Sequence, residues 1–198
     1  MAPIGRPALA PPLGPPRFVR DEPALADVLL GLKLARCPHC RQCGALIGHG
    51  LLLGYAERTS EVVVRGRRVF CSNRGQRPGC GRTYSVLLST VLYGFVVGTL
   101  TLFRFASAVM GGLTRRAAWL GAAAGALSLS SGYRLWRRLV AAQSWLRWRL
   151  CREAPAPACA ARQPLAQLFG HVGVVVGTAE PDLLEALQRR LQRGLFER

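Results

Sequence analysis

The chain has 198 residues, half of them apolar, which is enough for one ordinary domain or two small ones and excludes a wholly disordered protein. Its formal net charge is +17. Between Glu61 and Glu153 the sequence has fifteen arginines and no acidic residue, so this window is a polycation that indicates nucleic acid as the first candidate partner and an anionic membrane surface as the second.

Residues 1–20 open the chain with a proline-rich stretch, which predicts an extended, disordered tail. Residues 21–85 are expected to form the first folded unit. It begins with a short amphipathic helix over 21–33 and continues with two β-prone runs, 51–55 and 61–70, that have cysteine pairs at both ends. This pattern predicts a β-hairpin framed by two metal-binding turns.

The sequence has seven cysteines, and five of them lie between residues 37 and 80. An odd number at short spacings, with no basic-then-apolar secretory signal at the start of the chain, differs from the disulfide framework of a small secreted domain. Metal ligation in a reducing cytoplasm is therefore the expectation. The alternative is that these cysteines are free thiols of a small core.

Four of these cysteines suit one tetrahedral zinc ion. Cys37 and Cys40 form a CxxC knuckle, and Cys71 and Cys80 flank a turn that contains glycine. Cys43 is an alternative ligand, because it forms a competing pair with Cys40. Catalytic zinc sites keep one position open and usually use histidine or carboxylate ligands, so the sequence favours a structural zinc ion and indicates no enzyme.

After residue 85 the sequence predicts helices. A mainly helical domain is expected over 86–152, and 153–198 should form a linker followed by C-terminal helices that begin again after the prolines near 155–157. Within the helical domain, apolar runs predict helices near 86–97, 99–111, 114–126 and 131–150. The expected fold class is α+β, with the cysteine-bound hairpin first and the helices after it.

One predicted helix has an arginine-rich face. At 100° per residue, one side collects Tyr133, Trp136, Leu139, Val140, Leu146 and Leu150, and the other collects Arg134, Arg137, Arg138, Arg149, Trp145 and Trp148. The second set predicts contacts with phosphates or base edges in a major groove, and a solvated arginine face is the alternative. Arg74 and Arg77, in the turn between two cysteines, are expected to contact phosphates.

Three motifs resemble the zinc-ribbon domains of bacterial insertion-sequence transposases: Arg-Cys-Pro-His-Cys from residue 36, Arg-Val-Phe-Cys ending at residue 71, and Cys-Gly-Arg-Thr-Tyr-Ser from residue 80. The resemblance implies metal ligation by Cys37, Cys40, Cys71 and Cys80. The chain departs from that pattern in the long spacing between Cys71 and Cys80 and in Arg41, where glycine is usual.

In that family a helix-turn-helix often follows the ribbon, and Gly112–Leu120 together with Ser130–Leu139 resembles this arrangement. The family's nuclease domain, with its metal-binding carboxylates, has no counterpart among the few acidic residues after residue 152. The resemblance therefore implies a DNA-recognition module without catalysis. Its partner would be DNA, together with a transposase or a second copy of the chain.

An uncharged stretch supports a competing hypothesis. Residues 85–103 contain no Asp, Glu, Lys or Arg and are long enough to cross a hydrocarbon core, and 117–133 form a weaker candidate. The alternative is therefore a membrane protein with one or two transmembrane helices and a cytosolic zinc ribbon. Gly94, Gly98 and several hydroxyl residues dilute the hydrophobicity of the first stretch, so the DNA-binding hypothesis is preferred.

Overall fold

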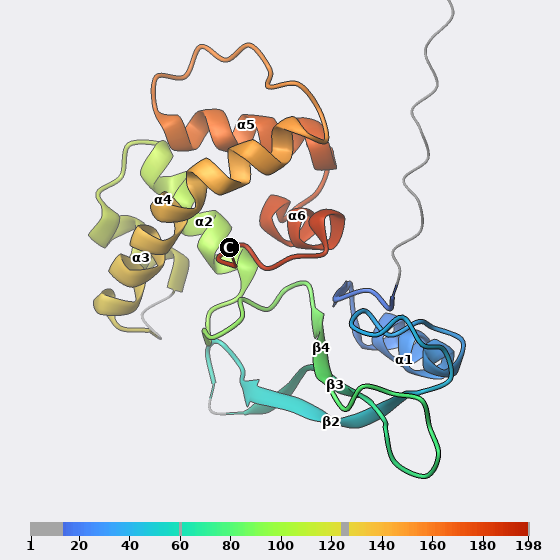
Figure 1. The fold of residues 1–198 in the computed structure, drawn as a ribbon. Coiled ribbons are helices and arrows are strands. Elements are labelled where there is room, and N and C mark those ends of the chain that lie inside the picture. The colour runs from blue at the N-terminus through green and yellow to red at the C-terminus, as the bar shows by residue number, and fades with distance from the viewer. Residues whose placement is uncertain (1–13, 60, 124–126, 198) are drawn as a thin grey trace, which may run out of the picture.

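The computed structural model describes residues 14–59, 61–123 and 127–197. Figure 1 shows a sheet with one short helix beside it, and a separate group of helices that the second half of the chain forms. The α+β class predicted from the sequence is confirmed. The first part contains β1 (Phe18–Val19), α1 (Glu22–Leu30), a 3-10 turn η1 (Gly31–Lys33), β2 (Leu46–Tyr55), β3 (Val62–Cys71) and β4 (Thr83–Leu88).

The sheet has the strand order β1-β4-β3-β2. Strands β2, β3 and β4 pair antiparallel in sequence, whereas β1 pairs parallel with β4. The predicted hairpin is therefore present, and its first strand is longer than the β-prone run suggested. Strand β1 lies inside the stretch predicted as a tail. It forms because it pairs with the edge of β4, which is distant in the sequence and cannot be seen from local residue patterns. The rest of the predicted tail, residues 1–13, lies outside the described residues.

A small apolar core lies between α1 and the sheet. Asp21 caps α1 by accepting a hydrogen bond of 2.9 Å from the Ala24 N–H, and the helix then buries its apolar side. The buried members of this core are Val19, Leu25, Leu32, Cys37, Ala45, Leu46, Val69, Cys71 and Val86. Two cysteines thus belong to the core that holds α1 against the sheet.

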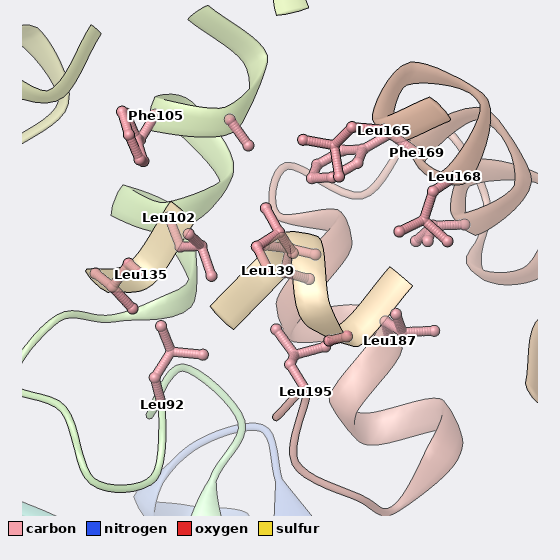
Figure 2. Packing of buried hydrophobic residues seen from close by; sticks show 14 of the residues in the cluster. Leu92, Leu102, Phe105, Leu135, Leu139, Leu165, Leu168, Phe169, Leu187 and Leu195 are labelled. Carbon is pink, nitrogen blue, oxygen red and sulfur yellow. The ribbon is translucent and has the colours of Figure 1, made fainter. Parts of the chain in front are cut away.

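The second half of the chain contains α2 (Thr99–Met110), α3 (Arg115–Ala123), α4 (Leu129–Cys151), α5 (Pro164–Val176) and α6 (Leu183–Leu191). Figure 2 shows apolar side chains of α2, α4, α5 and α6 converging, with Leu102 of α2, Leu139 of α4 and Leu187 of α6 among them. Burial of such side chains is the main source of stability in this part of the fold.

The predicted helix over 86–97 is wrong. Strand β4 continues to Leu88, and an isolated bridge between Val91 and Gly98 leads directly into α2. Gly94 adopts a left-handed conformation with φ of 80°, which ends any regular run at that point. The 85–103 stretch is therefore divided among a strand, a turn and the first turns of α2.

The other membrane candidate, 117–133, is divided between α3 and α4, and 124–126 lie outside the described residues. Among the helices that the structure describes, none is both long enough and apolar enough to span a membrane.

Candidate metal centre and arginine face

Four cysteine sulfurs form a compact group at the end of β3, whose last residue is Cys71. The Sγ atoms of Cys37, Cys40, Cys71 and Cys80 all lie within 4.8 Å of one another. The distance is 3.9 Å between the sulfurs of Cys37 and Cys80, and 3.7 Å between those of Cys40 and Cys71. A tetrahedral ion with bonds of about 2.3 Å needs sulfur–sulfur edges of about 3.8 Å, so this group could bind a metal ion.

A tight turn from Cys37 to Arg41 and a wide turn from Cys71 to Gly81 bring the four sulfurs together. In the first, the Arg41 N–H donates to the Cys37 carbonyl at 2.9 Å, and Arg41 has φ of 62°. This is the position where the resembled pattern has glycine, and the left-handed conformation accounts for that preference. In the second, the Gly81 N–H donates to the Cys71 carbonyl at 2.9 Å. Each turn therefore closes on the cysteine that begins it.

Backbone N–H groups donate to two of the four sulfurs, and the pKa values of the Cys40 and Cys71 thiols are shifted. The N–H of His39 donates to Cys37 Sγ at 3.4 Å, and the N–H of Cys80 donates to Cys71 Sγ at 3.3 Å. A backbone hydrogen bond at Gln42 lowers the pKa of the Cys40 thiol to about 7, whereas burial raises the pKa of the Cys71 thiol to about 12. A metal ion binds the thiolate form, so binding at this site would displace the proton of Cys71.

The three remaining cysteines lie elsewhere. Cys43, the alternative ligand, is exposed and is not part of the four-sulfur group. Cys151 and Cys159 are also exposed, and both line a hollow of about 340 Å³ beside the buried His171. The sequence spacing left Cys43 open as an alternative ligand, and the structure places Cys37, not Cys43, within the four-sulfur group.

No family model, curated protein or solved structure matches this chain. The resemblance to transposase zinc ribbons therefore remains a hypothesis that depends on the motifs themselves. The four-sulfur geometry is independent of it.

The arginine-rich helix is α4, and α3 is held against its first turns. Trp119 of α3 is buried, and its indole N–H donates to the carbonyls of Leu127 and Ser128, at 3.3 Å and 3.0 Å. Gly132 packs on the indole ring so closely that a Cβ there would lie 2.6 Å from two ring atoms. These contacts fix the orientation of α4 relative to α3.

The predicted inward face of α4 is only partly right. Leu139, Leu146 and Leu150 are buried as expected, but Tyr133 and Val140 are exposed. Leu135 and Ala142 take their places, because the helices that cover α4 contact a stripe rotated away from the one that the sequence suggested. A helical wheel is drawn from the sequence of one helix, so it cannot show which side the neighbouring helices will cover.

The arginines predicted to bind nucleic acid fall into separate groups. Arg134, Arg137 and Arg138 are exposed and together line an open hollow of about 480 Å³ beside Gly94 and Phe95. Among the described residues, none of the three forms an ion pair with a carboxylate.

The other predicted residues have different surroundings. Arg149 pairs with Glu153 at 3.5 Å, and Trp145 is partly buried beneath the guanidinium of Arg193, 5.2 Å from its ring centre. Arg74 and Arg77 are exposed in the loop between β3 and β4, next to the four cysteines. The structure thus groups three of the predicted residues on the first turns of α4, places two more in the cysteine loop, and separates Arg149 and Trp145 from both groups.

Proposed function

We propose that this protein is a zinc-dependent DNA-binding protein of the cytoplasm without catalysis of its own, related to the recognition modules of insertion-sequence transposases. The observation that carries the proposal is the group Arg134, Arg137 and Arg138, which are exposed together on α4 and form no ion pair with a carboxylate among the described residues. The α3–α4 pair would act as a helix-turn-helix, with a transposase or a second copy of the chain as a further partner.

The position of these arginines on the helix supports the DNA part of the proposal. In a helix-turn-helix the N-terminal turns of the second helix contact base edges, and all three arginines lie in the first three turns of α4. Arg115 and Arg116, in the first turn of α3, are exposed as well. Duplex DNA is the polyanion that fits a helix lined in this way, because its major groove admits one α-helix between two rows of phosphates.

The four cysteines support the zinc part. A set of four thiolates with no open position is typical of structural zinc sites, and soft thiolate ligands favour zinc over magnesium or calcium. The metal would hold Arg74 and Arg77 in place, since their loop begins at Cys71 and ends at Cys80. The zinc would thus order a second group of cations that contacts phosphates.

Duplex binding at several salt concentrations tests the proposal. If phosphate contacts dominate, the logarithm of the affinity should fall linearly and steeply with the logarithm of the salt concentration. Fluorescence anisotropy of a labelled duplex measures this with the metal-loaded full chain. An affinity that is flat between low and physiological salt would contradict the proposal, and so would stronger binding to vesicles of anionic lipid than to DNA.

A further inference from the structure

Two cysteines outside the metal centre face the same hollow. Cys151 is the last residue of α4, and Cys159 lies in the connection between α4 and α5, which Figure 1 shows as a long loop. Both residues are exposed, both are free thiols, and both line the hollow of about 340 Å³. Only seven residues separate them in the sequence. The fold therefore brings two accessible thiols to one place.

Hydrogen bonds from α5 hold both ends of this connection. At the first end, Nε2 of the buried His171 lies 2.9 Å from the carbonyl oxygen of Ala154. A carbonyl only accepts hydrogen bonds, so this ring nitrogen carries the proton. At the second end, the side-chain amide of Gln167 donates to the Ala161 carbonyl at 2.8 Å. One helix thus positions the connection beside the end of α4.

The middle of the connection is not held in this way. Among the residues that the structure describes, 155–160 form no hydrogen bond with another part of the chain, and most of them are exposed. A disulfide requires the two sulfurs to approach to about 2.05 Å. Because Cys159 lies in this middle part, it can move towards Cys151 without breaking a hydrogen bond of the fold.

The charge of the hollow favours an anionic reagent. Arg147 lines it, and the guanidinium is held there because it donates to the Pro164 carbonyl and to Oε1 of Gln167, the latter at 3.2 Å. None of the described residues that line the hollow is acidic. Its volume is within the range of small-molecule sites. A small disulfide that carries carboxylates, such as oxidised glutathione, fits this combination of charge and accessible thiols.

We propose that Cys151 and Cys159 form a dithiol redox site, which an anionic low-molecular-weight disulfide oxidises to an intramolecular disulfide. The thiolate of one cysteine attacks a sulfur of the small disulfide, so a mixed disulfide forms and one small thiolate leaves. The thiolate of the other cysteine then attacks the protein sulfur of the mixed disulfide. The bond between the two cysteines forms, and the second small thiolate leaves. The two protein thiols lose two electrons and two protons in total, and the small disulfide gains them as two thiols.

This redox site goes beyond the proposed function and does not depend on it. Neither cysteine belongs to the four-sulfur group, and the exposed arginines lie on the first turns of α4, whereas Cys151 is at its last residue. In a reducing cytoplasm, disulfides of this kind are transient and respond to the redox state, and they are not structural. Oxidation would tie the end of α4 to the connection, and an excess of small thiol would reverse it.

Oxidation of the metal-loaded full chain with oxidised glutathione tests the proposal. After the reaction, free thiols are alkylated, and mass spectrometry of the digested protein identifies the state of each cysteine. We expect a disulfide between Cys151 and Cys159. Cys43 should instead keep a mixed disulfide with glutathione, because it is exposed and lies outside both groups.

A serine variant tests the second step of the reaction. Cys159→Ser should raise the amount of glutathione bound at Cys151 by at least about tenfold, because the thiol that displaces glutathione is gone. The matched control is Cys43→Ser, which removes another exposed thiol and should leave the intramolecular disulfide unchanged. Unchanged metal content and circular dichroism would establish that each variant is folded.

Three results would overturn the proposal. The first is stable glutathione adducts, or disulfides between chains, at both cysteines of the wild type. The second is an adduct at Cys151 that is no more abundant in Cys159→Ser than in the wild type. The third is a second metal ion per chain that Cys159→Ser removes, since the hollow would then be a metal site with His171 as a further candidate ligand. Elemental analysis of the reduced protein detects such an ion.

Discussion

The side-chain amide of Gln188 in α6 donates hydrogen bonds to the backbone carbonyls of Ser89, at 2.7 Å, and Val91, at 3.1 Å. Gln188 is fully buried, and Ser89 directly follows β4. These carbonyls belong to the irregular segment between the sheet and α2, which has no ladder partner for them. A residue near the end of the chain therefore supplies the hydrogen-bond donors for the backbone carbonyls of the segment that joins the sheet to the helices.

Replacing Gln188 with Leu should lower the free energy of unfolding by about 2 to 4 kcal/mol, because it removes the donor for two carbonyls in a dry environment. Urea unfolding monitored by circular dichroism measures this. The control is Gln143→Leu in α4, a partly exposed position expected to change stability by less than about 0.5 kcal/mol. Equal effects of the two changes would mean that the buried hydrogen bonds contribute little.

Serine substitutions test the metal centre. Cys37→Ser or Cys80→Ser should abolish binding of one metal ion per chain, because each removes one of the four converging thiolates. Cys43→Ser and Cys151→Ser should retain the metal, since both residues are exposed and outside the group. Elemental analysis of freshly reduced protein measures the content. Loss of metal in Cys43→Ser but not in Cys37→Ser would show that the ligand set is different.

Two glycines test the packing of α3 on α4. Gly132→Ala should lower the free energy of unfolding by about 1 to 3 kcal/mol, because the new methyl group would overlap the Trp119 ring and force α3 and α4 apart. Gly121→Ala in α3 meets no atom within 4 Å and should stabilise the protein by up to about 1 kcal/mol through helix propensity. Thermal unfolding compares the two. A stabilising Gly132→Ala would contradict the described helix contact.

Arginine variants distinguish base recognition from charge. If α4 contacts base edges, Arg134→Ala should weaken the binding free energy for a preferred DNA sequence by about 1 to 3 kcal/mol. It should also reduce the ratio of the affinity for that sequence to the affinity for random DNA. Arg149→Ala is the matched control on the same helix and should have less effect, because Arg149 already pairs with Glu153. Arg74→Ala or Arg77→Ala should weaken binding to all sequences about equally. The assignment fails if selection from a random pool enriches no motif and Arg134→Ala behaves like Arg74→Ala.

Asp182 should make stability depend on pH. Its carboxylate accepts from the N–H groups of Leu184 and Glu185, but burial raises its pKa above the unfolded value. Folding therefore favours the protonated form, so this stabilising contribution is lost as the pH rises through the folded-state pKa. Asp182→Asn should still cap α6 and should remove the loss of stability with rising pH. Asp182→Ala should lower the free energy of unfolding by about 1 kcal/mol at every pH. Unfolding measured across acidic and neutral pH compares the three proteins, and parallel curves for Asp182→Asn and the wild type would contradict the effect.

Local patterns predicted much of the molecule. The helices near 99–111 and 131–150 form almost as expected, since each has apolar residues at helical spacing and a start or stop signal nearby. The stretch 86–97 misled the prediction because an uninterrupted apolar run has no period that separates a strand from a buried helix. It became a strand and a turn because β3 presents a pairing edge there and Gln188 satisfies the carbonyls beyond it.

The sequence by itself determined the five clustered cysteines from which a metal site could be formed, with Cys43 left open as an alternative, and where the positive charge is concentrated. Both are local properties, because a short turn fixes the separation of two sulfurs and an acid-free window stays cationic in any fold. The tertiary structure decided which arginines lack an acidic partner, which side of α4 is buried, and which residue covers β1 at the edge of the sheet. Those outcomes depend on residues far away along the chain, such as Gln192, whose side-chain amide hydrogen-bonds to the backbone of Phe18 in β1 only after the chain has folded.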